Sequence, residues 1–406
     1  MKYEMKKIII KPVNKFVFFL TTIIVIAFAI LAIKDVSFVT SEGENIYGIT
    51  AAKRLREQKN DWKGYLTDDV LLAVYNLDKE CELQGLENSN DEIENEKKYA
   101  KAQGAMDIRD LVNEAFSGPD EYDYYKISKL DKAELSSFYS TRRKDVDEYL
   151  DSTEGGYSEA EKNYVLNKYS EMQMPLYYAD ADGWKTLLKA AYFPSILIVI
   201  ILAIGFLVSG IFSDEFKYHA DDVFFSTKQG RNKAIIKKIC TGIITITVVY
   251  WFEVLVFTSI VLGTLGFDGA NCLIETDADN WRSIYNISFV QEYWITVIGA
   301  YIGCLFILTL SMYVSIKTKQ ALVAVTIPFF FACVCPFLGR VTFLTKIVNL
   351  LPGQLLQLNT LFKYIYLYTF GGKVFGLIEL VVILYLILSL MMIPSLYFSM
   401  KKIRGR

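Results

Sequence analysis

The sequence has little of what most catalytic and metal sites are built from. It contains one histidine, His219, in 406 residues. A single histidine excludes H-E-x-x-H zinc proteases and sites with three histidine ligands. The sequence also lacks the G-x-S-x-G element of serine hydrolases and the G-x-x-x-x-G-K-[ST] loop that binds nucleotide phosphates. We therefore expect no catalytic residue, no metal site and no nucleotide hydrolysis in this chain, and we assign His219 a structural role.

The six cysteines do not indicate a disulfide framework. Four of them lie in apolar runs, where cysteine is a small buried side chain. These are Cys240, Cys304, Cys333 and Cys335. Cys81 and Cys272 lie in polar segments, but two cysteines so far apart in sequence are weak evidence for a disulfide. We expect no bond between them.

Long apolar runs are what the sequence has in abundance, since 53% of its residues are hydrophobic and only 22% are charged. A helix needs about 20 apolar residues to cross a bilayer. Such runs lie at residues 16–33, 194–212, 240–265, 294–314, 321–338 and 374–398. The first is too long for a secretory signal and no small-x-small cleavage site follows it, so we expect an anchor. The sequence predicts an all-α integral membrane protein with six transmembrane helices.

Basic residues set the expected orientation, because Lys and Arg of short loops stay on the cytoplasmic side of a membrane. With the N-terminus inside, the inner segments hold 17 basic residues. They are residues 1–15, 213–239, 315–320 and 400–406. The short outer loop, residues 266–293, has one basic residue, Arg282, against five acidic ones. Both termini are therefore expected in the cytoplasm.

The predicted organisation has three parts. Residues 1–33 form the N-terminus and the first transmembrane helix, residues 34–186 an extracellular domain, and residues 187–406 transmembrane helices two to six. Apolar residues three or four apart predict helices in the domain, with Thr67 and Ser158 as N-caps. Its 33 acidic and 20 basic residues give a formal charge of −13. This charge either solvates the surface or attracts a cationic ligand such as an antimicrobial peptide.

The stretch SDEFKYHADDVFFSTKQGRNKAIIKK, residues 213–238, is a charged segment after the second predicted helix. Ser213 is suited to cap a new helix, and two acidic residues follow in the first turn, where the helix dipole favours anions. Phe216, Val223 and Phe224 then fall on one apolar face. The pattern predicts a short amphipathic helix, which either lies in the lipid headgroups or docks on a partner.

The stretch GIFSDEFKYHADDVFFSTKQGRNKAIIKK resembles the corresponding loop of ATP-binding cassette transporter permeases of the type-2 exporter class. The matching residues are Phe212, Glu215, Ser226, Gly230, Arg231 and Lys237 or Lys238. PLYYADADGWKTLL, before the second predicted helix, is similar to the lead-in of the same family. The resemblance implies that residues 213–238 hold the coupling helix, which sits in a cleft of a nucleotide-binding subunit.

The residues assigned to ATPase coupling in this way are Asp214, Glu215, Phe216, Asp221, Asp222, Phe224, Gly230 and Arg231. The resemblance implies a separate cytoplasmic ATPase that binds ATP and Mg²⁺, and a second permease, identical or not. It implies a bacterial plasma membrane as the location. We expect no cofactor in this chain and no nucleic-acid partner.

Two glutamates fall within predicted transmembrane helices. Glu253 lies near the middle of the third and Glu379 nearer the outer end of the sixth. An ionisable group at bilayer depth is costly and usually faces a bundle interior, a partner or water. We expect Glu253 to face another helix or a cation route, whereas Glu379 faces either the bundle or the interface. Residues 339–373, interrupted by Pro352-Gly353, predict two re-entrant or interfacial helices on the outer side.

The leading interpretation is the permease subunit of an ATP-driven exporter for a peptide-like or amphipathic substrate. The alternative is a membrane-anchored sensor or interaction protein whose acidic extracellular domain binds a ligand. A secondary transporter is disfavoured, because the sequence shows no inverted repeat and no pair of broken helices.

The orientation is testable with single cysteines in a cysteine-free background. We expect Asn88→Cys and Asp277→Cys to react with an impermeant thiol reagent on intact cells, because both positions are predicted to lie outside. Gln229→Cys and Gln320→Cys should react only after the cells are opened. Labelling of Gln229→Cys on intact cells would contradict the orientation.

Overall fold

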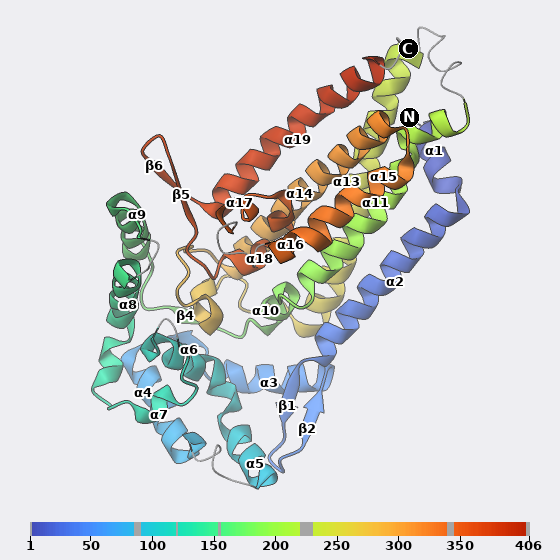
Figure 1. Cartoon of the computed structure of the whole chain (residues 1–406). Helices are drawn as coiled ribbons and strands as arrows, with labels where there is room; N and C mark the ends of the chain where they lie inside the picture. Colours follow the sequence, from blue (N-terminus) through green and yellow to red (C-terminus); the bar gives the residue numbers. More distant parts are fainter. Residues whose placement is uncertain are drawn as a thin grey trace.

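The structure is a computed structural model that describes residues 2–84, 91–118, 121–152, 156–219, 230–338 and 345–402. It is about 75% helical. A bundle of long helices carries a compact, mostly helical unit at one end (Figure 1). We call this end the domain end. Both termini lie at the opposite end, which we call the terminal end.

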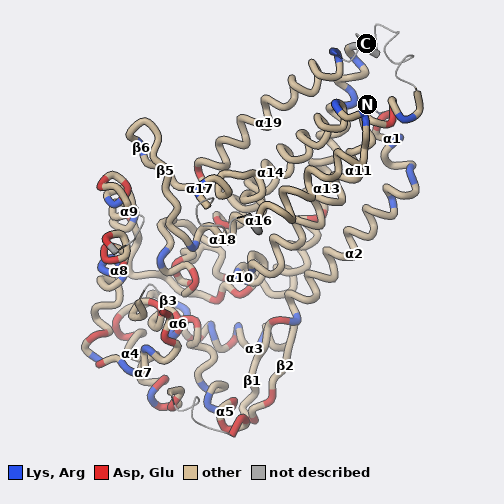
Figure 2. The backbone as a smooth tube through the Cα atoms, viewed as in Figure 1, with Lys and Arg blue, Asp and Glu red and all other residues tan. Residues whose placement is uncertain are grey.

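Five helices of the described residues are long and apolar enough to cross a membrane. They are α2 (Pro12–Lys34), α11 (Phe193–Lys217), α13 (Ile235–Leu265), α14 (Phe289–Thr318) and α19 (Leu377–Lys402). Charged residues gather at the two ends of the bundle and leave its middle almost free of charge (Figure 2). These features confirm the expectation of a helical membrane protein. In the apolar stretches of α11 and α14 67% of the residues are buried, against 28% in those of α2 and α19.

The predicted span over residues 321–338 is not among the five. It consists of α15 (Ala321–Phe329), a π-helical turn (Phe330–Val334) and α16 (Cys335–Leu338). Pro328 has no N–H to donate to the carbonyl of Ala324, four residues earlier. Ser311 of α14 donates its hydroxyl to that carbonyl instead, at 2.7 Å. The carbonyl of Ala324, which the proline leaves without a helical hydrogen bond, thus has a partner in α14. An unpaired carbonyl would be costly in the low dielectric of a membrane.

The prediction of two helices over residues 339–373 is wrong. The described part begins with three short helical turns: α17 (Thr345–Val348), a 3₁₀ helix (Pro352–Gln357) and α18 (Leu358–Leu361). A hairpin of β5 (Leu367–Phe370) and β6 (Lys373–Gly376) follows. Gly371 and Gly372 form its two-residue turn with φ of 57° and 79°, the positive values that such a turn requires.

The 3₁₀ helix packs closely on α14. A Cβ atom at Gly303 would lie 2.7 Å from Cβ of Leu355. Because glycine has no Cβ, this segment can approach the backbone of α14 directly. The short turns therefore belong to the bundle and cover α14 at the domain end.

The unit formed by residues 34–186 is mainly helical, as expected, but it also contains two small antiparallel ribbons. Its elements are β1 (Ser37–Val39), β2 (Asn45–Tyr47), α3 (Ile49–Asn60), β3 (Gly64–Tyr65), α4 (Asp68–Glu80), α5 (Glu92–Ala102), α6 (Met106–Phe116), α7 (Lys126–Lys129), α8 (Phe138–Ser152), α9 (Glu159–Ser170) and β4 (Tyr177–Tyr178). Thr67 is the N-cap residue of α4 and Ser158 that of α9. Both predicted N-cap positions are confirmed. Ser158 forms a full capping box with Glu161, whereas the side chain of Thr67 makes no capping hydrogen bond.

The loop between α13 and α14 completes the core of this unit. Trp281 from the loop is 1% exposed, and its ring centroid lies 4.7 Å from that of Phe138 in α8. Arg282 pairs with Glu114 and donates to the carbonyl of Ser117, at 2.9 Å, just after α6 ends. Residues 266–293 are thus part of the packed unit as well as a connection between helices.

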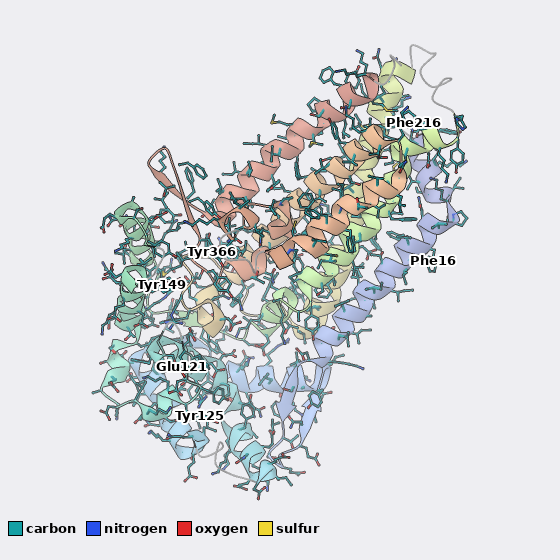
Figure 3. The ribbon with its side chains drawn as sticks, viewed as in Figure 1. Phe16, Glu121, Tyr125, Tyr149, Phe216 and Tyr366 are labelled. Carbon is teal, nitrogen blue, oxygen red and sulfur yellow. The ribbon has the colours of Figure 1, made fainter. Side chains whose placement is uncertain are left out.

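The hairpin also contacts the unit. The hydroxyl of Tyr157 donates to the carbonyl of Ile365 at 3.1 Å, and Thr369 of β5 donates to Glu161. Tyr149 of α8 and Tyr366 ahead of β5 mark the two sides of this contact (Figure 3). Three separate parts of the chain therefore meet at the domain end.

A buried charge cluster joins the unit to the bundle through α10 (Asp182–Leu188). Lys59 of α3 lies 2.9 Å from Asp107 of α6 and 2.6 Å from Asp182. Lys185 lies 3.0 Å from Asp107 and 3.8 Å from Asp277. Burial would raise the pKa of Asp107, but Lys185 and Lys59 outweigh burial and hold that pKa well below its usual range. The cluster is therefore charged and internally compensated.

The cluster includes Asp277, one of the positions for cysteine labelling. Asp277 is half-buried against Lys185, so the exposed Asn286 is a better position in the same loop. Gln320 is exposed at the terminal end. Asn88 and Gln229 lie outside the described residues.

Candidate functional site

The predicted coupling segment begins inside a long helix. α11 continues to Lys217, and the hydroxyl of Ser213 donates to the carbonyl of Ser209 at 3.0 Å within it. The prediction that Ser213 caps a new helix is therefore wrong. The apolar stripe of α11 extends to Phe216, and burying that ring favours continuing the helix over starting another.

The rest of the coupling segment is only partly described. Tyr218 and His219 follow α11, and His219 has a φ of 50°. The predicted positions Asp221, Asp222 and Phe224 lie outside the described residues. Gly230 and Arg231 belong to a π-helical turn (Gly230–Ala234) that leads directly into α13. The segment thus connects two core helices of the bundle at the terminal end.

Glu215 is the centre of an ion network at this end. Its Oε1 lies 2.7 Å from Nζ of Lys238 in α13 and 3.2 Å from Nζ of Lys7. Lys238 also donates to the carbonyl of Ile211 at 2.7 Å and lies 3.5 Å from Glu4. The network ties α11 and α13 to the N-terminal helix α1 (Lys2–Ile10).

The neighbouring acidic residue takes part as well, because Asp214 pairs with Lys11 between α1 and α2. Burial disfavours the charged form of Lys7, but the carboxylates of Glu215 and Glu4 outweigh burial and raise the pKa of Lys7. The sequence pattern does not indicate that Lys7, Lys11 and Lys238 pair with Glu215 and Asp214, although Lys7 and Lys11 precede α2 and Lys238 ends the coupling segment. Their approach depends on tertiary packing.

Phe216 is buried at the end of α11, and Figure 3 labels it at the terminal end. It belongs to the main apolar core of the bundle, and Nζ of Lys319 lies 4.9 Å from its ring centroid. Asp214, Glu215 and Phe216 therefore contact their own bundle. Changing them would disturb helix packing as well as any partner contact.

Glu253 lies between two helices. It is 0% exposed in α13, and its Oε1 accepts a hydrogen bond of 2.7 Å from the hydroxyl of Thr22 in α2. Its Oε2 is buried without a hydrogen-bond partner among the described residues. The carboxyl group thus joins α2, a peripheral helix, to the core of the bundle.

Glu379 lies in the first turn of α19 at the domain end. The hydroxyl of Tyr285 is 3.5 Å from its Oε2. It is half-buried and lines a pocket with residues of α14 and α9. The two glutamates therefore occupy separate places and share no site.

The thiols of Cys81 and Cys272 are both free and buried. Cys81 packs with Leu83 and Met106 in the unit, while Cys272 packs in the core of the bundle. No group of three or more metal-ligating side chains lies together in the described part of the chain.

The ion pair of Arg142 and Glu275 is also buried, and the sequence pattern does not indicate it. The guanidinium of Arg142 lies between the rings of Tyr169 and Trp281, with its Cζ 4.9 Å from each centroid. Its Nη2 is 3.8 Å from Oε1 of Glu275. Neither carboxylate oxygen of Glu275 has a hydrogen-bond partner among the described residues. Burial raises the pKa of Glu275 to about 7, although Arg142 opposes the rise.

This raised pKa predicts a pH dependence of stability. Between about pH 4.5 and pH 7 the folded protein binds a proton at Glu275 that the unfolded chain releases, so stability falls as pH rises through that range. A change in pKa from 4.5 to about 7 corresponds to roughly 3 kcal/mol. We expect Glu275→Gln to raise the thermal unfolding temperature of the full chain in detergent more at pH 8 than at pH 5.

The matched control is Glu121→Gln, which changes an exposed glutamate of the same unit. It should leave the unfolding temperature unchanged at both pH values. An equal effect of Glu275→Gln at pH 5 and pH 8 would contradict the prediction.

Comparisons with protein-family models, with curated proteins and with solved structures found no match to this chain.

Proposed function

We propose that the chain is the permease subunit of an ATP-driven exporter of the ATP-binding cassette class in a bacterial plasma membrane. In this proposal six helices cross the membrane, with residues 321–338 as the fifth, and both termini lie in the cytoplasm. Residues 34–186 and 266–293 lie outside. The bundle of apolar helices with charges confined to its two ends supports the membrane part of the proposal.

One observation carries the proposal beyond a membrane location. α11 ends and α13 begins at the terminal end (Figure 1), and the Glu215–Lys238 ion pair links these two helices on either side of the coupling segment. A force applied to this segment would act on two core helices at once. This is what coupling between an ATPase and a transport path requires.

The energy for transport would come from a second protein. The sequence contains no G-x-x-x-x-G-K-[ST] motif for nucleotide phosphates, and phosphoryl transfer needs phosphate contacts together with Mg²⁺. We assign ATP and Mg²⁺ to a cytoplasmic ATPase that binds residues 220–231, including Asp221, Asp222 and Phe224. A second permease, identical or not, completes a closed twofold assembly.

The substrate in this proposal is peptide-like or amphipathic. The outer unit carries a formal charge of −13, which raises the local concentration of cations and speeds their encounter. The negative charge attracts the cationic group of such a molecule, and its apolar part dissolves in the bilayer next to α19. The exposed apolar surface of α19 supports such a route.

We expect Phe224→Asp and Arg231→Glu to abolish co-purification of the ATPase while the permease stays folded in the membrane. In Phe224→Asp, a carboxylate buried on a docked apolar face costs several kcal/mol. In Arg231→Glu, the reversed charge repels the acidic groups of the partner that the arginine would attract. The measurement is recovery of Mg²⁺-dependent ATP hydrolysis with the tagged permease from native membranes. Phe216→Asp is unsuitable, because Phe216 is buried in the bundle.

The matched control is Phe370→Asp, which makes the same change at an exposed position of the hairpin at the domain end. This variant should retain the ATPase. Full ATPase recovery with both Phe224→Asp and Arg231→Glu would contradict the assigned coupling segment. Co-purification of a histidine kinase without an ATPase would favour the sensor over the exporter.

A further inference from the structure

A pocket of about 520 Å³ lies at the domain end, where α14 and α19 begin and α9 ends. Three parts of the chain build it. α9 contributes Lys168 and is followed by Glu171, the loop before α14 contributes Tyr285, and the first turns of α19 contribute Glu379 and Ile383. The pocket therefore joins the charged unit to the start of two membrane helices.

One wall of this pocket is apolar and accessible from the side of the bundle. Ile295 of α14 and Val382 of α19 line it, and Ile383 is 57% exposed on the outer surface of α19. These residues lie within two turns of the starts of α14 and α19. A molecule inserted in the adjacent leaflet can reach this wall without crossing the bundle.

The polar part of the pocket is acidic. Glu379 and Glu171 contribute two carboxylates, and Lys168 contributes one ammonium group. Among the described residues, no Lys or Arg forms an ion pair with either Glu379 or Glu171, and the one polar contact of the Glu379 carboxylate is the Tyr285 hydroxyl, at 3.5 Å. A carboxylate next to an apolar wall favours a ligand that brings its own positive charge.

We propose that this pocket binds a cationic amphipathic molecule from the adjacent membrane leaflet, with its amine at Glu379 and Glu171 and its apolar chain along α14 and α19. An anionic ligand would meet two carboxylates against one ammonium group. A neutral ligand would gain only the apolar wall. The role of the pocket as an entry point for cargo rests on the proposed exporter function, whereas binding itself needs no ATPase.

Three probes with the same twelve-carbon chain and the same dansyl group test the charge preference. One ends in an amine, one in an alcohol and one in a carboxylate. Binding is measured by fluorescence on the full chain in nanodiscs of zwitterionic lipid, with empty nanodiscs subtracted. We expect the amine to bind about tenfold more tightly than the alcohol, the size of one partly screened charge pair.

Glu379→Gln should reduce this preference to about twofold or less without weakening the binding of the alcohol. Ile383→Trp should weaken both the amine and the alcohol, because the indole occupies the apolar wall. The matched control is Glu253→Gln, which neutralises a glutamate of the bundle outside the pocket and should leave all three affinities unchanged.

Equal binding of the three probes, or an unchanged preference in Glu379→Gln, would contradict a cation site and leave only an apolar crevice for lipid. If none of the probes binds, the pocket is not a binding site for amphipathic molecules. The discs contain no ATPase, so the result is independent of coupling. A chain that binds the amine but recruits no ATPase would overturn the exporter function and keep the binding site.

Discussion

The buried charge cluster of Lys59, Asp107, Asp182 and Lys185 is the interaction on which the arrangement of the molecule depends. It lies where the charged unit meets the membrane helices. Such a cluster adds little net stability, because taking charges out of water is costly, but removing one partner costs about 3–5 kcal/mol. The cluster therefore specifies one position of the unit over the bundle and resists sliding or detachment.

The cluster connects directly to the terminal end. α10 supplies Asp182 and Lys185, and α11 begins five residues after α10 ends. α11 then runs through the core of the bundle to Glu215, which pairs with Lys238 and Lys7. One ion network thus lies just ahead of the start of α11, on α10, and another lies near its end, at Glu215. In the exporter that we propose, α11 would connect the pocket at the domain end with the coupling segment at the terminal end.

Sequence patterns predicted the features that depend on residues close together in the chain. Apolar runs predicted the five long helices, and Ser158 predicted the capping box of α9. The wrong predictions, for the end of α11 and for residues 367–376, have two causes: tertiary packing and the conformation of a glycine turn. Phe216 extends α11 because the bundle buries its ring. Gly371-Gly372 forms a hairpin turn inside an apolar segment whose composition favours helices. The contacts of Trp281 with Phe138, of Glu275 with Arg142 and of Glu215 with Lys7 each join residues more than a hundred positions apart, which periodicity does not report.

The most direct test of the account is reconstitution of the permease with its co-purified ATPase in liposomes. Transport of the dansyl amine is followed with the terminal end facing the medium that contains ATP. The account predicts transport that needs the permease, the ATPase and Mg²⁺-ATP together, and that stops when the ATPase cannot hydrolyse ATP. Transport by the permease alone, driven by an ion gradient, would contradict it, as would a complex that hydrolyses ATP without moving the amine or any other amphipathic cation.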